Sequence, residues 1–218
     1  MTQTASLFKT LVVAASLAAA ATVAQADGLK DLETFLREVG SARANFTQVV
    51  TSPPRTGETA ARSKTSSGWF EFLRPNRFRF EYTQPFPQTI VADGQTLWLY
   101  DADLNQVTAR AQKDALGSTP AALIASGTDL KALGEVFELK AAPAAGGLEW
   151  VEARPKARDG QLQSVRVGFK VGQLAVLEIA DSLGQRSVIT FNQWQGNAPL
   201  KADRFRFQPP AGADVIRP

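Results

Sequence analysis

The sequence has 218 residues and contains neither cysteine nor histidine. Without these two side chains the chain lacks the commonest general bases, nucleophiles and soft metal ligands, and it cannot form disulfides. Its formal net charge of +3 is too small to indicate a nucleic-acid partner.

The first 26 residues have the features of a secretory signal peptide. Lys9 precedes an apolar run over residues 11–23, and Ala24-Gln25-Ala26 has the A-x-A pattern of a cleavage site. The run is shorter than the ~20 residues that a helix needs to cross a bilayer. We therefore expect a mature chain of residues 27–218, forming one domain. Because it has no cysteine for a lipid anchor, we expect a soluble protein in the exported compartment, a bacterial periplasm.

The N-terminal half of the mature chain predicts one helix followed by an antiparallel meander. Apolar residues at helical spacing predict a helix over residues 27–39, which Gly40 ends. An extended segment over residues 43–50 precedes a Pro- and Gly-rich loop over residues 52–62. Period-two alternation and turn residues then predict strands over residues 66–73, 78–82, 89–91, 96–100 and 106–110.

Two short helices are predicted to interrupt the sheet. Thr119 and Pro120 form a helix start, the apolar residues 121–125 follow, and a second helix is expected over residues 129–133. The first helix is apolar on all sides and too short to be stable alone, so it must pack against another element. Strands are then predicted over residues 136–141, 148–153, 162–169, 174–180 and 186–194, and the tail alternates again over residues 205–210.

An aromatic wall, formed by Phe78, Phe80 and Tyr82, is predicted within the meander. The three rings are two residues apart, so in a strand they face one side, and Arg77, Arg79 and Glu81 face the other. Two interpretations are open, because the wall could be ordinary core or the lining of a ligand cavity. A curled antiparallel sheet that does not fill its concave side encloses a cavity, and short helices could cover it.

Catalytic and metal-binding patterns are missing from the sequence. Asp101 and Asp103 begin like a calcium loop, but Gln106 and Gln112 occupy the positions that require Gly and Glu. We expect no enzymatic activity, no metal and no cofactor.

Several short motifs occur in order along the mature chain. They are R-P-N-R-F-R-F at 74–80, T-Q-P at 83–85, I-V-A-D-G-x-x-L-W-x-Y at 90–100, T-P at 119–120 and F-x-F-x-P-P-x-G-x-x-V at 205–215. Together they span nearly the whole mature chain, and the set resembles the LolA family of periplasmic outer-membrane lipoprotein carriers.

This resemblance implies a mainly β fold with α: an unclosed antiparallel barrel of about eleven strands, whose N-terminal helix and short lid helices cover a hydrophobic cavity. It implies a periplasmic chaperone that shields the acyl chains of triacylated lipoproteins. The carrier would take them from an inner-membrane ABC transporter and deliver them to a LolB-like outer-membrane receptor lipoprotein. That receptor carries a lipidated cysteine, so the cysteine-free chain fits the carrier, as a monomer without nucleic acid. The alternative is a regulatory module of the same fold that senses lipid or misfolded protein.

The predicted acyl-binding residues come from the aromatic wall, the strand over 96–100 and the first lid helix: Phe78, Phe80, Tyr82, Leu97, Trp98, Leu123 and Ile124. The sequence leaves open whether Leu97 or Trp98 faces the cavity. The resemblance also implies that Arg74 is a latch, which holds the empty cavity shut by donating hydrogen bonds to backbone carbonyls of the lid helices. A solvated or strand-edge arginine is the alternative.

Overall fold

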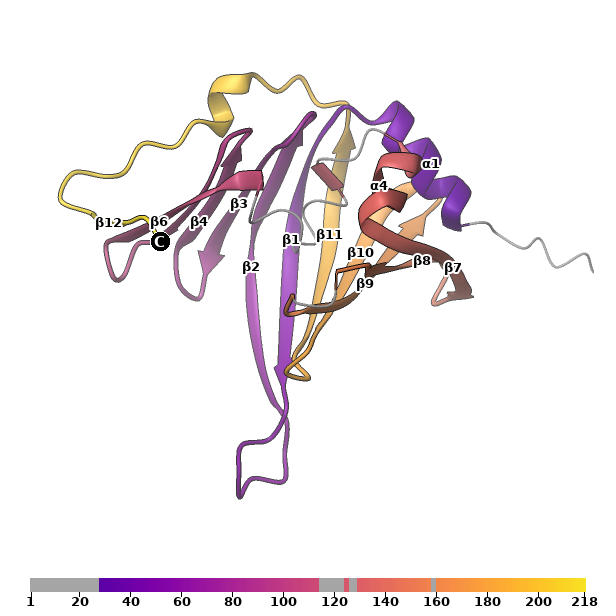
Figure 1. The fold of residues 1–218 in the computed structure, drawn as a ribbon, viewed down its shortest axis with the longest axis horizontal. Coiled ribbons are helices and arrows are strands. Elements are labelled where there is room, and N and C mark those ends of the chain that lie inside the picture. The colour runs from indigo at the N-terminus through magenta and orange to yellow at the C-terminus, as the bar shows by residue number, and fades with distance from the viewer. Residues whose placement is uncertain (1–27, 114–123, 126–128, 158–159) are drawn as a thin grey trace, which may run out of the picture.

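A computed structural model of the protein describes residues 28–113, 124–125, 129–157 and 160–218. Its strands form one open sheet in the order β12-β6-β5-β4-β3-β2-β1-β11-β10-β9-β8-β7 (Figure 1). The elements are α1 (Gly28–Glu38), β1 (Ser41–Ser52), β2 (Arg62–Leu73), β3 (Arg77–Gln84), β4 (Gln88–Asp93), β5 (Thr96–Asp101), β6 (Gln106–Ala111), α4 (Leu130–Val136), β7 (Phe137–Ala145), β8 (Leu148–Pro155), β9 (Leu162–Lys170), β10 (Gln173–Asp181), β11 (Arg186–Gly196), the 3₁₀ helix η1 (Ala202–Phe205) and β12 (Asp214–Ile216).

The predicted meander is confirmed, and its strands are longer than the alternation indicated. β1 and β2 pair without a register shift from Ser41 opposite Leu73 to Ser52 opposite Arg62. This long hairpin extends beyond the rest of the sheet (Figure 1). The fold class predicted from the sequence, an unclosed and mainly β structure, is therefore correct.

The second predicted lid helix exists, with different bounds. Asp129 is its N-cap, because the carboxylate accepts a hydrogen bond of 2.7 Å from the backbone N–H of Ala132. The helix continues to Val136, a residue that the sequence pattern assigns to the next strand. Of the first predicted lid helix, only Ile124 and Ala125 lie within the described residues.

The tail differs from the prediction. Residues 205–210 alternate like a strand, but η1 occupies residues up to Phe205, and the strand β12 follows later and pairs with β6 in parallel. The segment between β11 and β12 crosses the end of the sheet toward β6 (Figure 1). Phe205 is completely buried there. Burial against the outer face of the sheet, and not pairing within it, therefore explains the alternating aromatic residues.

Helix α1 packs on the inner, concave face of the sheet. The aromatic wall lies on the same face, across from the helix. Its buried residues Leu32, Phe35 and Leu36 belong to the main hydrophobic cluster. At its start, Gly28 approaches the strand β8 so closely that a Cβ atom would lie 2.4 Å from the carbonyl oxygen of Trp150. Only glycine fits this position, so the start of α1 is fixed directly on the sheet.

Candidate functional site

The three rings of the aromatic wall lie on one face, as their spacing predicts. The ring centroids of Phe78 and Phe80 are 6.1 Å apart, and those of Phe80 and Tyr82 are 6.4 Å apart. Phe70 and Phe72 of β2 pair directly with Phe80 and Phe78 and extend the wall sideways. The wall therefore forms a continuous aromatic surface on the concave side of the sheet.

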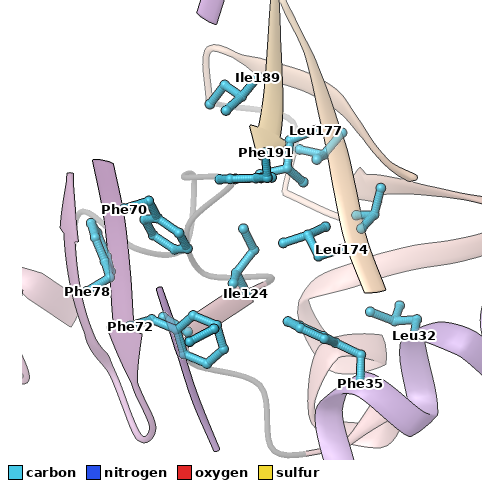
Figure 2. Close-up of a cluster of buried hydrophobic side chains, with 14 of the residues drawn as sticks. Leu32, Phe35, Phe70, Phe72, Phe78, Ile124, Leu174, Leu177, Ile189 and Phe191 are labelled. Atoms are coloured by element: carbon cyan, nitrogen blue, oxygen red, sulfur yellow. The ribbon is translucent and has the colours of Figure 1, made fainter. Parts of the chain in front are cut away.

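In this structure the wall is covered by other apolar side chains. The covering group, called the cover below, consists of α1 with Ile124 and Ala125. Phe35 of α1 packs against Phe72 at a centroid distance of 6.0 Å, and Ile124 is almost completely buried. Figure 2 shows Ile124 between Phe70 and Phe72 on one side and Leu174 on the other. Phe72 is completely buried, and Phe78 and Phe80 are only 2% and 7% exposed.

Strand β5 answers the question of whether Leu97 or Trp98 faces inward. Leu97 is opposite Ala92, which is opposite Phe78, so Leu97 lies on the concave face. Trp98 points the other way: its ring packs against Phe207 of the C-terminal segment at 5.6 Å, and its indole N–H donates to Asp93. Trp98 was therefore wrongly placed among the cavity residues, because adjacent residues of a strand face opposite sides. Leu123 lies outside the described residues.

Arg74 holds the cover through its guanidinium group. It donates five hydrogen bonds to four backbone carbonyl oxygens, those of Phe35, Leu36, Val39 and Ile124. The guanidinium also lies over the rings of Phe35 and Phe72, at 4.9 and 5.2 Å. Three of the four carbonyls are at the C-terminal end of α1, where the macrodipole favours a cation. The carbonyl oxygen of Phe35 also accepts from the backbone N–H of Val39 at 3.1 Å. Arg74 is thus neither solvated nor a simple strand-edge residue.

The electrostatics of Arg74 fit this arrangement. Burial lowers its pKa to about 10, so the side chain remains a cation at neutral pH. The predicted contact with lid-helix carbonyls occurs at Ile124, whereas the contact with the N-terminal helix was not predicted. The apolar periodicity of α1 shows that it packs on a surface, but it does not show which residue reaches its last carbonyls.

Two polar residues near Arg74 also support the cover and were missed in the sequence. The backbone N–H of Asn76 donates to the carbonyl oxygen of Ala125 at 3.0 Å. The side chain of Gln112, which is buried, donates to the carbonyl oxygen of Asn76 at 2.6 Å and accepts from the backbone N–H of Gly94 at 2.9 Å. The side chain of Gln112, which follows β6, therefore holds the turn that begins at Arg74 in place. Gln112 gave no sequence signal beyond its position after a strand.

The wall ends in an open cavity of about 570 Å³ near the β3–β4 turn. Tyr82 lines it, and burial raises the pKa of this tyrosine to about 12. Phe86 is 57% exposed there, with the Lys64 ammonium 4.7 Å from the centre of its ring. Other lining residues are Gln48, Ser66, Asp101 and Leu104. The aromatic surface thus continues into a mixed polar and apolar opening.

The convex face of the same strands is closed by ion pairs. The carboxylate of Glu71 is 1% exposed and binds Arg43 at 2.7 Å and Arg204 at 2.7 Å. Arg204 belongs to η1, which packs on β3 and β4. The hydrogen bond from Arg204 to Glu71 raises the pKa of the arginine. The C-terminal segment is therefore attached to this face by the ion pair between Arg204 and Glu71 as well as by the burial of Phe205.

An open β-sheet with an aromatic concave face and a hydrogen-bonded cover defines a class of protein that encloses apolar ligands. Among the described residues, no helix is both long and apolar enough to cross a membrane. Within the same ranges, no three acidic side chains lie together as metal ligands would.

Comparisons with known proteins identify the family. The family described as outer membrane lipoprotein carrier protein LolA matches residues 37–208. An outer-membrane lipoprotein carrier protein of Albidiferax ferrireducens is 61% identical over 205 residues, covering 92% of this chain and 96% of the relative. Its counterpart in Methylibium petroleiphilum is 54% identical over 202 residues, covering 93% and 95%. The chain therefore belongs to the LolA family, as its motifs predicted.

A solved structure shares the fold. It is an uncharacterized conserved protein from Thermus thermophilus, with a TM-score of 0.50 and 14% identity. The match covers 88% of this chain and 97% of that one. At this identity the likeness concerns the fold alone.

Proposed function

We propose that this protein binds the acyl chains of triacylated outer-membrane lipoproteins and carries them across the periplasm without catalysing a reaction. The observation that carries this proposal is the aromatic wall beneath a cover held by Arg74. The wall offers a large apolar surface, and the cover is attached to it by hydrogen bonds that can break and form again. Membership of the LolA family supports lipoprotein as the cargo.

The physical need for such a carrier follows from the hydrophobic effect. Removing a methylene group from an apolar environment costs ~0.8 kcal/mol, so three chains of about sixteen carbons would cost on the order of 35 kcal/mol to expose. Acyl chains of this size must therefore pass directly between enclosed sites. An inner-membrane ABC transporter would supply the lipoprotein, and a LolB-like receptor lipoprotein at the outer membrane would accept it.

Loading requires the cover to move, because the wall is buried in this structure. Phe72 cannot contact an acyl chain until Phe35 moves away from it. The hydrogen bonds of Arg74 would break when the chains enter and form again when they leave. The closed form stabilises the empty protein and so favours release to the acceptor.

The direct test is to isolate the protein from the periplasm of producing cells and to identify bound molecules by mass spectrometry. We expect a triacylated lipoprotein to co-purify in a 1:1 complex, and to move to receptor-containing liposomes on mixing. A protein that carries no lipoprotein and does not bind a purified triacylated lipoprotein in vitro would contradict the proposal.

A further inference from the structure

The pairing between β10 and β11 stops before either strand ends. The last pair is Val176 opposite Thr190. β10 begins at Gln173 and β11 ends at Gly196, so both strands extend past this pair without a further partner in each other. An open cavity of about 420 Å³ lies at this place. The gap between the two strand ends is called the seam below.

The cavity lies between the strands and not over one face of the sheet. Its lining includes the consecutive residues Leu174 and Ala175 of β10, and Phe191 and Asn192 of β11. Consecutive residues of a strand face opposite sides, so a cavity that touches both members of each pair passes between the strands. Beside the cavity, β10 also shifts register against β9, and β11 shifts register against β1. The sheet is therefore interrupted along three adjacent ladders.

The seam divides the sheet into two parts with different partners. Helix α1 lies against β7, β8, β9 and β10, and α4 packs on β7 (Figure 1). These strands and helices are called the helix half. The remaining strands, from β12 to β11 in the sheet order, are called the wall half, because β2 and β3 carry the aromatic wall.

Helix α1 is joined closely to the helix half. A Cβ atom on Gly28 would lie 2.4 Å from the carbonyl oxygen of Trp150 in β8. Phe35 packs against Phe169 of β9 at a centroid distance of 5.8 Å, and Phe169 is completely buried. Lifting α1 away from β8 and β9 would expose this apolar surface to water, which is unfavourable.

The contacts between α1 and the wall half lie at the open end of the seam. Phe35 packs against Phe72 of β2 at 6.0 Å and against Trp194 of β11 at 6.1 Å. Trp194 also lines the cavity in the seam. Arg74 donates to the last carbonyl oxygens of α1. Loading requires Phe35 to move away from Phe72, so α1 must either leave the helix half or move together with it.

We propose that the paired end of the β10–β11 hairpin is a hinge, about which the helix half turns away from the wall half to admit acyl chains. This inference rests on the proposed function. The turn of the hairpin is well fixed, because Asp181 accepts from the backbone N–H groups of Leu183 at 2.9 Å and Gln185 at 2.8 Å. Separating the halves at the seam breaks no ladder pair between β10 and β11, since the pairing has already ended there.

The chain between α1 and β1 suits such a motion. Gly40 is attached to the wall half: its backbone N–H donates to the side chain of Asn197 at 2.9 Å, and its carbonyl oxygen accepts from the backbone N–H of Arg74 at 2.9 Å. Glycine adopts more backbone conformations than any other residue. Bond rotations at Gly40 can therefore absorb a turn of α1 while β1 stays in place.

The test cross-links the open end of the seam. The chain has no cysteine, so Gln173→Cys with Asn192→Cys introduces two thiols on the cavity lining and no others. Both positions are exposed. A short bifunctional methanethiosulfonate joins the thiols through bonds that a reducing agent cleaves. We expect the joined protein to load and release a triacylated lipoprotein at least about tenfold more slowly, and reduction to restore both rates.

Two controls separate a hinge motion from other effects. Ala180→Cys with Arg186→Cys places a disulfide across the paired end of the same hairpin, where opposite Cα atoms are ~5 Å apart. A monofunctional methanethiosulfonate on Gln173→Cys with Asn192→Cys adds bulk without joining the strands. Both controls should leave the rates unchanged. Unchanged rates in the protein cross-linked at the seam would overturn the inference.

A dye supplies a second measurement that needs no lipoprotein. Anilinonaphthalene sulfonate becomes fluorescent on exposed apolar surface. Arg74→Leu weakens the closed form, so we expect dye fluorescence to rise about twofold or more, and the seam cross-link to suppress this rise. A rise that persists after cross-linking, or no rise in either form, would contradict the hinge. If the dye responds as expected but the unlinked protein binds no lipoprotein, the proposed function fails and the hinge remains.

Discussion

The concave and convex faces of β2 and β3 are built from alternate residues of the same strands, yet they are closed in different ways. On the concave face, Phe72 packs against Phe35 of the cover, and Arg74 donates hydrogen bonds to carbonyl oxygens of the cover. On the convex face, Glu71 binds two arginines, one of which anchors the C-terminal segment. An apolar contact with a few hydrogen bonds at its edge can open as a unit, whereas removing the arginines from a buried carboxylate is costly. The concave face is therefore suited to binding and releasing a ligand, and the convex face to holding the C-terminal segment permanently.

The largest expected effect comes from introducing a glutamate on the concave face. The same residue introduced on the convex face is the control. Phe78→Glu puts a carboxylate in the wall, and we expect the affinity for a triacylated lipoprotein to fall at least about 100-fold, because an unpaired charge is costly among apolar groups. Arg79→Glu, one residue away on the convex face, should leave binding nearly unchanged. Lipoprotein binding and thermal melting are measured for both. If Phe78→Glu abolishes folding and not only binding, the wall is ordinary core.

The next effect concerns the attachment of the cover. Arg74→Leu removes five hydrogen bonds from a charged donor, each worth roughly 1.5–3 kcal/mol, and so weakens the closed empty form. We expect loading to persist and release to receptor-containing liposomes to slow about tenfold or more. Arg77→Leu, in the same motif, is the matched control. Unchanged release in Arg74→Leu would show that Arg74 is not a latch.

A smaller effect is expected on the convex face. Glu71→Gln keeps the shape of the side chain but removes its charge from between Arg43 and Arg204. We expect the free energy of unfolding in urea to fall by about 1–3 kcal/mol while lipoprotein affinity stays the same. Glu138→Gln removes an exposed ion pair with Lys140 and should change stability by less than about 0.5 kcal/mol. A loss of affinity in Glu71→Gln would mean that the two faces are coupled.

The smallest effects distinguish two neighbours in β5. Leu97→Ala should weaken lipoprotein binding roughly tenfold, because it removes apolar surface from the concave face. Trp98→Phe removes the hydrogen bond to Asp93 on the convex face and should cost about 1 kcal/mol of stability without affecting binding. The reverse result would contradict the assignment of the two faces.

Much of the fold could be predicted from local patterns. Alternation places Phe78, Phe80 and Tyr82 on one side of a strand, and turn residues separate the strands, because strand geometry has a period of two regardless of what lies around it. The order of the R-P-N and other motifs was enough to indicate the family. The segment over residues 205–210 shows the limit of this reasoning, since its alternation reflects burial of Phe205 and not membership of a strand.

The sequence by itself therefore determined the strands, the aromatic wall and the family of this protein. Only the tertiary structure decided that Trp98 lies outside the wall, that Arg74 holds the end of α1, and that Glu71 meets Arg204 from the far end of the chain. The physical reason is that periodicity fixes which residues share a face within one element. Which face is concave, and what covers it, depends on contacts between residues that are distant in the sequence.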